Sequence, residues 1–312
     1  MKNRRWLLPL ALLALAVPGF AQDKIVTSAS LFDRYDVNAT WVRLPAGQTW
    51  GEGGTVSVAT DGKGTVIALV RSAPYFRVFT TAGKFVKAWG EPGQFDHAHS
   101  VHIAPDGAVW ATDPNIHLIY KFSPEGKLLM TLGKKGVAGD NLSHDTFNRP
   151  AGLAFAANGD IFVADGYGNS RIVQLDKNGA YIRMFGGKKG NGPGELSLPH
   201  AVALDPAGRV VVADSANKRI SIFNKDGSFA TSFAGPGRGG IAVTPDGTIY
   251  ASDIYSGVVT VFRNDRIADV IRVGDRPHGM GVDPTTGDIY VASTDPLAPN
   301  ITKASPKPPA SK

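Results

Sequence analysis

The chain contains no cysteine among its 312 residues, so no disulfide bond can hold its fold together. Beyond the N-terminus it also lacks any apolar run that approaches the roughly 20 residues a membrane-spanning helix needs. The formal net charge is +6, but residues 1–21 and residues 299–312 each contribute three of these positive charges, so the part between them is neutral. A neutral core gives no electrostatic basis for binding nucleic acid.

The first residues have the pattern of a secretory signal peptide. Lys2, Arg4 and Arg5 precede an apolar run, and small residues then lead to a predicted cleavage after Ala21. We therefore expect an exported protein, either periplasmic or secreted, with no membrane span. Residues 299–312 are mostly Pro, Ala, Ser and Lys, and we expect them to form a disordered tail.

Between Gly54 and Ser293 one strand pattern recurs roughly every 40–50 residues, which is the spacing of propeller blades. Each copy alternates apolar and polar residues between glycine-rich turns, most clearly in Pro150–Leu175 and Pro199–Phe223. No stretch after the signal keeps the 3.6-residue period of a helix. Six copies predict an all-β, six-bladed β-propeller over residues 22–298. The copies resemble NHL repeats.

The last copy runs out after two or three strands. The segment Trp41–Leu44, before the first copy, reads as a lone outer strand. We expect this N-terminal strand to complete the last blade and so close the ring, because closure removes exposed sheet edges.

One position of the repeat carries the strongest functional signal. It lies at the start of the first strand of each copy, eight or nine residues before the glycine of the first turn. In chain order this position holds Gly54, His99, Ala151, His200, Gly239 and His278. Histidines from alternate blades, near 120° apart, would meet on the axis of the ring, and the small residues between them would leave room for a metal and a substrate.

Three neutral imidazoles with one open direction are typical of a catalytic zinc site. A single histidine at this position is more often a turn or core residue. The strict alternation of His99, His200 and His278 favours the metal site instead. Of the other histidines, His97 and His102 lie close enough to His99 in the sequence that one of them could hold a metal ligand in place through a hydrogen bond.

The loops after the second strands should open on the same face as these histidines. Tyr167 lies in such a loop of the third copy, and Arg71 follows the corresponding strand of the first. Either could be a surface residue, or they could overlook the metal together. The Asp, Asn and Arg residues that surround these loops, in Asp165–Ile172 and Asp214–Ile220, are interpreted as structural.

The repeats resemble the peptidyl-α-hydroxyglycine α-amidating lyase family. The resemblance rests on PHAVALDP at the second histidine, RPHGMGVDP at the third, HSVHIAPDGAVWATD at the first and FVADGYGNSRIVQL around the tyrosine. It implies that His99, His200 and His278 bind Zn²⁺, that Tyr167 is the catalytic phenol and that Arg71 is an active-site arginine. It further implies a peptide or small-molecule substrate ending in α-hydroxyglycine, which is cleaved to an amide and glyoxylate.

Two positions depart from that family. Ser215 stands where the family has an arginine, and Gly279 stands where it has an aspartate that holds a structural calcium, which counts against Ca²⁺ here. Two other readings stay open. One is a non-enzymatic exported propeller that binds a peptide, glycan or protein partner. The other is a different metal-dependent propeller enzyme, such as a lactonase or an antibiotic-ring lyase.

Overall fold

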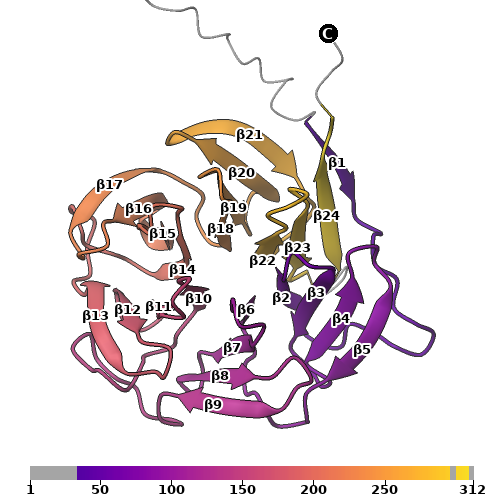
Figure 1. Ribbon diagram of the computed structural model, residues 1–312, viewed down its shortest axis with the longest axis horizontal. Coiled ribbons are helices and arrows are strands. Elements are labelled where there is room, and N and C mark those ends of the chain that lie inside the picture. The colour runs from indigo at the N-terminus through magenta and orange to yellow at the C-terminus, as the bar shows by residue number, and fades with distance from the viewer. Residues whose placement is uncertain (1–33, 296–299, 309–312) are drawn as a thin grey trace, which may run out of the picture.

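Six four-stranded antiparallel sheets surround a central axis in the computed structural model, which describes residues 34–295 and 300–308 (Figure 1). Each sheet is one blade, with its first strand next to the axis and its last strand at the rim. The predicted all-β, six-bladed propeller is confirmed. Within the described ranges no helix is long and apolar enough to cross a membrane. The predicted signal peptide, residues 1–21, lies outside them.

Blades 1 to 5 each use four consecutive strands. From the axis outward, blades 1 to 3 are β2 (Thr55–Thr60), β3 (Thr65–Val70), β4 (Phe76–Thr80) and β5 (Phe85–Trp89); β6 (Ser100–Ile103), β7 (Val109–Asp113), β8 (Leu118–Phe122) and β9 (Leu128–Leu132); and β10 (Gly152–Phe155), β11 (Ile161–Asp165), β12 (Arg171–Leu175) and β13 (Tyr181–Gly186).

Blades 4 and 5 follow the same order. They are β14 (Pro199–Leu204), β15 (Val210–Asp214), β16 (Arg219–Phe223) and β17 (Phe229–Ala234), with a 3-10 turn, η2 (Ser215–Asn217), after β15; and β18 (Ile241–Val243), β19 (Ile249–Asp253), β20 (Val258–Arg263) and β21 (Arg266–Arg272).

Blade 6 is assembled from both ends of the chain. From the axis outward it contains β22 (Pro277–Val282), β23 (Ile289–Ser293), β24 (Ile301–Pro306) and β1 (Tyr35–Asn38). The prediction that an N-terminal strand closes the ring is therefore right in kind but wrong in position, because the closing strand is β1 and not Trp41–Leu44.

The prediction of a disordered tail from residue 299 is also wrong for Ile301–Pro306. In β24 the side chains of Ile301 and Ala304 are 1% and 0% exposed, and Lys303 forms an ion pair of 2.7 Å with Asp288. The composition of the whole tail concealed this short strand, which both β23 and β1 need as a partner.

The segment Trp41–Leu44 instead seals the seam between blades 6 and 1. The Trp41 ring packs 5.0 Å from the Tyr290 ring, centroid to centroid, and its indole N–H donates a hydrogen bond to the Thr81 carbonyl. Trp41, Val42 and Leu44 all contact the apolar cluster of that seam.

The core is divided into six apolar clusters, one at each contact between neighbouring blades. Strand β15 shows why its sequence is apolar at nearly every position. Val210 and Val212 pack toward blade 3, whereas Val211 and Ala213 pack toward blade 5. Because both faces of the strand are buried, a continuous apolar run replaces the usual alternation.

Buried aspartates at the ends of second strands form hydrogen bonds to the loops that precede the innermost strands of the same blades. The Asp165 carboxylate accepts a hydrogen bond from the Asn148 amide N–H, and that of Asp214 accepts one from the Ser197 amide, just before the innermost strands of their blades. Arg171 pairs with Asp165 at 2.9 Å, with both side chains fully buried, and donates to three loop carbonyls. The structural interpretation of this motif is consistent with these contacts.

Replacing Arg171 with methionine should destabilise the protein strongly. The substitution leaves the Asp165 carboxylate buried without its cation, which typically costs about 3–5 kcal/mol. Urea or thermal unfolding of the variant measures this loss. Arg266→Met, at an exposed arginine of β21, is the control and should change stability by less than about 0.5 kcal/mol. Equal stability of the two variants would contradict the assigned role of Arg171.

Candidate metal centre

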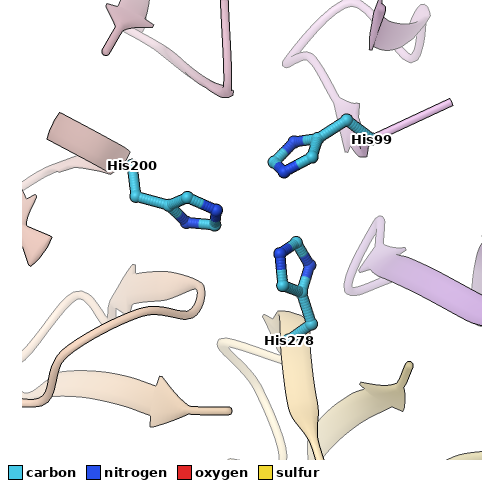
Figure 2. Close-up of side chains that lie close together, drawn as sticks. All are labelled: His99, His200 and His278. Atoms are coloured by element: carbon cyan, nitrogen blue, oxygen red, sulfur yellow. The ribbon is translucent and has the colours of Figure 1, made fainter. Parts of the chain in front are cut away.

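The structure brings the three predicted histidines together at one mouth of the central channel (Figure 2). His99 directly precedes β6, whereas His200 and His278 lie at the starts of β14 and β22. Their ring centroids are 5.0 to 5.1 Å apart, and one nitrogen from each ring lies within 4.8 Å of the others. The side chains are only 2 to 4% exposed. The three-fold arrangement follows from their places in blades 2, 4 and 6.

Each histidine is oriented by the neighbouring blade. Its Nδ1 lies 2.8 Å from a backbone carbonyl oxygen, that of Ala151 for His99, of Gly239 for His200 and of Val56 for His278. Since a carbonyl only accepts hydrogen bonds, each Nδ1 carries the proton. The lone pair of each ring is therefore on Nε2, and a hydrogen bond of this kind to the second nitrogen is usual for a metal-binding histidine.

The positions between the histidines differ from the sequence prediction in two ways. In blade 1 the residue that matches Ala151 and Gly239 by its contact with a histidine is Val56, whereas the turn spacing aligned Gly54 with them; β2 has a register shift between Thr55 and Ser57. Gly239 does not leave room for a ligand. A Cβ there would lie 2.1 Å from the Ser252 carbonyl oxygen, so glycine is required by close packing.

Burial keeps the three imidazoles neutral. It lowers the pKa of His200 to about 4, and it holds the pKa values of His99 and His278 well below their usual range, where the neighbouring histidines lower them further. The neutral imidazole is the form that binds a metal ion.

Tyr167 lies at the centre of this group. Its hydroxyl oxygen is 2.9 Å from Nε2 of His99 and 3.0 Å from Nε2 of His200, and the Arg238 guanidinium donates a hydrogen bond to it. Burial raises the pKa of the phenol, while the positive charges of Arg238, Arg71 and Arg149 act in the opposite direction.

Above the histidines a cavity of about 290 Å³ opens to solvent. Arg71 lines it, as the topology of the first blade predicted. Three further arginines that the sequence analysis missed line the same cavity: Arg149, Arg238 and Arg276. A signal for two of them was present, since Arg149 and Arg276 each precede a proline at the same point of blades 3 and 6.

The other histidines have structural contacts. Nε2 of His102 accepts a hydrogen bond from the Leu153 amide, and Nδ1 of His117 accepts one from the Arg149 amide. His144 stacks on Tyr181 at the rim. His97 lines the arginine-rich cavity but makes no hydrogen bond through its ring to the three histidines.

The donor set fits zinc. Two Nε2 lone pairs face the Tyr167 hydroxyl, which has a single proton, and no hydrogen bond from a described residue reaches Nε2 of His278. At least two ring nitrogens therefore lack a donor, which is the situation that a cation would satisfy. Three neutral imidazoles are a usual ligand set for zinc.

The channel below the histidines does not fit calcium. Calcium requires several oxygen ligands, usually with carboxylates among them. None of the residues that line the small cavity there is acidic. At Gly279 a Cβ would lie 2.4 Å from Oγ of Ser57, so the aspartate expected from the family resemblance could not be accommodated.

A larger hollow of about 1020 Å³ lies at the opposite mouth of the channel, among the turns that join first and second strands. None of the predicted site residues lines it. The chemistry-bearing side chains are therefore concentrated at the smaller cavity.

Comparison with known proteins identifies the family of the repeat. Residues 147–175 and 196–223 match the model of the NHL repeat. Human NHL repeat-containing protein 3 is 32% identical over 290 residues, which cover 83% of this chain and 81% of that protein. The chain belongs to the NHL-repeat propeller family. Its homologues within that family include peptidyl-α-hydroxyglycine α-amidating lyases, as the sequence resemblance predicted.

One of them, a probable peptidyl-α-hydroxyglycine α-amidating lyase of Caenorhabditis elegans, is 37% identical to this NHL-repeat protein over 135 residues. These residues cover 42% of this chain and 38% of the relative. Among solved structures, a streptogramin B lyase superposes with a TM-score of 0.60 at 14% identity, covering 89% of this chain and 99% of that one. This second similarity establishes the shared propeller fold.

Proposed function

We propose that this NHL-repeat protein is an exported, zinc-dependent carbon–nitrogen lyase. Its substrate would be a peptidyl-α-hydroxyglycine or a similar carbinolamide, which it cleaves to an amide and glyoxylate. The observation that carries the proposal is the position of the Tyr167 hydroxyl, within 3.0 Å of the free nitrogens of two of three converging histidines. The lyases among its homologues support the same reaction class.

His99, His200 and His278 would hold the zinc ion through Nε2. When bound there, zinc supplies a Lewis acid that stabilises negative charge developing on the substrate hydroxyl and on the Tyr167 oxygen. The remaining steps concern groups of the chain itself.

Tyr167 is placed to move the proton. In its ionised form the Tyr167 oxygen takes the proton of the substrate hydroxyl and becomes the neutral phenol, the carbon–oxygen bond becomes the carbonyl of glyoxylate, and the carbon–nitrogen bond breaks. The phenol then returns the proton to the departing amide nitrogen. No water is consumed, so the products are one amide and one glyoxylate.

Arg238 and Arg71 assist by charge. The Arg238 guanidinium donates to the phenol oxygen, which favours the ionised form of Tyr167 during the transfer. Ser215 replaces the arginine expected from the family resemblance. The guanidinium that contacts Tyr167 is instead that of Arg238, which precedes β18 of blade 5.

A metal assay paired with a product assay tests the proposal. Purified protein loaded with zinc should contain about one bound ion per chain and release glyoxylate from N-benzoyl-α-hydroxyglycine, faster than this carbinolamide breaks down in buffer. Treatment with a chelator should abolish release, and added zinc should restore it. Zinc binding without any glyoxylate release would reject the lyase.

The second candidate is a non-enzymatic propeller that binds a peptide, glycan or protein partner. It is favoured by two relatives that match 83% and 80% of this chain and are named only as NHL repeat-containing protein 3. The absence of both metal and turnover in the assay above would favour it. Determining the N-terminal residue of the protein recovered from its host would test export and cleavage after Ala21.

A further inference from the structure

Four arginines of the cavity have no acidic partner. The cavity is lined by Arg71, Arg149, Arg238 and Arg276 and by no aspartate or glutamate, and none of the four forms an ion pair with a carboxylate of a described residue. Elsewhere in the described chain arginines do pair with aspartates; these are Arg34, Arg171, Arg209, Arg219 and Arg263. Arg43, Arg77, Arg183, Arg266 and Arg272 also lack a carboxylate partner among the described residues, but none of these five lines the cavity, whereas the other four line one space together.

The two inner arginines are half-buried and incompletely bonded. The Nε atoms of Arg71 and Arg238 are buried and have no hydrogen-bond partner among the described residues. Burial lowers the pKa of Arg71, and the nearby charges of Arg238 and Arg276 lower it further, against the effect of Tyr167. An anion between these groups would relieve both the unmet hydrogen bonds and the repulsion.

The two outer arginines, Arg149 and Arg276, are exposed and come from blades 3 and 6, on opposite sides of the ring. Both have a left-handed backbone conformation, with φ of 62° and 50°, directly before a proline. Leu198 has the same conformation at the same place in blade 4, with φ of 56°. Since leucine satisfies this turn, the turn itself does not require an arginine, and the guanidiniums serve another purpose.

A single carboxylate has two oxygens and is satisfied by one or two guanidiniums. The α-hydroxyglycine end of the proposed substrate carries one such group, which the half-buried Arg71 and Arg238 can meet beside Tyr167. Arg149 and Arg276 would then remain unpaired at the mouth of the cavity.

We propose that this site selects carbinolamides with a second anionic group on the acyl side, and that Arg149 and Arg276 recognise this group. The inference rests on the proposed lyase activity and specifies its substrate as a small dianion. It assigns a specificity role to two residues outside the metal centre.

A pair of matched substrates tests the inference. N-succinyl-α-hydroxyglycine carries the second carboxylate, and N-succinamoyl-α-hydroxyglycine has an amide of the same shape in its place. With the zinc-loaded protein, kcat/KM for glyoxylate release should be about tenfold or more higher for the dianion, as expected for one hydrogen-bonded charge. In Arg149→Leu and Arg276→Leu this ratio should fall toward one, with leucine chosen because Leu198 already occupies this turn.

Arg272→Leu, at an exposed arginine on the rim strand β21 that does not line the cavity, removes the same charge and should leave the ratio unchanged. A second readout needs no turnover. Succinate should raise the melting temperature of the metal-free protein more than its half-amide succinamate does, and the Arg149→Leu/Arg276→Leu double variant should lose this difference.

Equal kcat/KM for the two substrates, or a ratio that the leucine variants do not change, would overturn the inference while leaving the lyase intact. Failure of both substrates together with N-benzoyl-α-hydroxyglycine would instead reject the lyase, whereas failure of the two alone would overturn the inference. In that case the succinate measurement alone would decide whether the arginines form a dianion site.

Discussion

Tyr167→Phe should reduce kcat for glyoxylate release by about 10²- to 10⁴-fold, which is the usual contribution of a positioned proton-transfer group. Phenylalanine retains the ring between Arg149 and Arg238 but removes the hydroxyl that faces His99 and His200. Because all three imidazoles remain, the variant should still bind zinc. Comparing kcat with zinc content in one preparation separates loss of chemistry from loss of metal.

Tyr181→Phe is the matched control for that experiment. Tyr181 lies in β13 at the rim, away from the channel, and its ring stacks on that of His144. The loss of its hydroxyl should therefore leave kcat unchanged. If Tyr167→Phe turned over as fast as this control, Tyr167 would have no part in proton transfer.

His200→Ala should weaken zinc binding by more than about 100-fold. Loss of a supporting hydrogen bond behind a metal ligand costs 10- to 100-fold in affinity, and removal of a ligand removes more. The variant keeps only His99 and His278 as imidazole ligands, and the carbonyl of Gly239 loses its donor. Competition with a zinc-sensitive chelating dye measures the affinity directly, without any assumption about the reaction.

His144→Ala, at an exposed histidine outside the channel, should bind zinc as the unaltered protein does. A His200→Ala variant that kept the affinity of this control would mean that the three histidines do not share an ion. The buried imidazoles would then be structural groups of the channel.

The sequence predicted those features that repeat. The spacing of the blades and the alternation of His99, His200 and His278 are periodic. Because the same pattern recurs along the chain, it predicted both the propeller fold and the convergence of the three imidazole rings. Tyr167 and Arg71 could be placed on the same face because strand direction alone determines which loops lie there.

Features that depend on a single copy were harder to predict. The register shift in β2 places Val56, and not Gly54, at the position equivalent to Ala151 and Gly239, and nothing in the local composition indicates it. Strand β24 was obscured by the lysines and prolines around it, although burial of Ile301 and Ala304 is what closes the ring.

The arginines illustrate a different limit. A single sequence does not distinguish a loop arginine that is solvated from one that lines a site. The approach of Arg238, which leads into blade 5, to Tyr167 of blade 3 depends on the path of a long side chain, which no strand period determines. Only the Arg-Pro pair shared by blades 3 and 6 could have indicated that Arg149 and Arg276 belong together.

Pairing of β1 with β24 has a consequence for synthesis of the protein. Until Ile301–Pro306 has been synthesised, the sixth sheet lacks β24 and β1 has no partner strand. Each translation product that stops short of Ile301 is therefore an open arc, which leaves the apolar seam around Phe79 and Tyr290 accessible to chaperones and proteases.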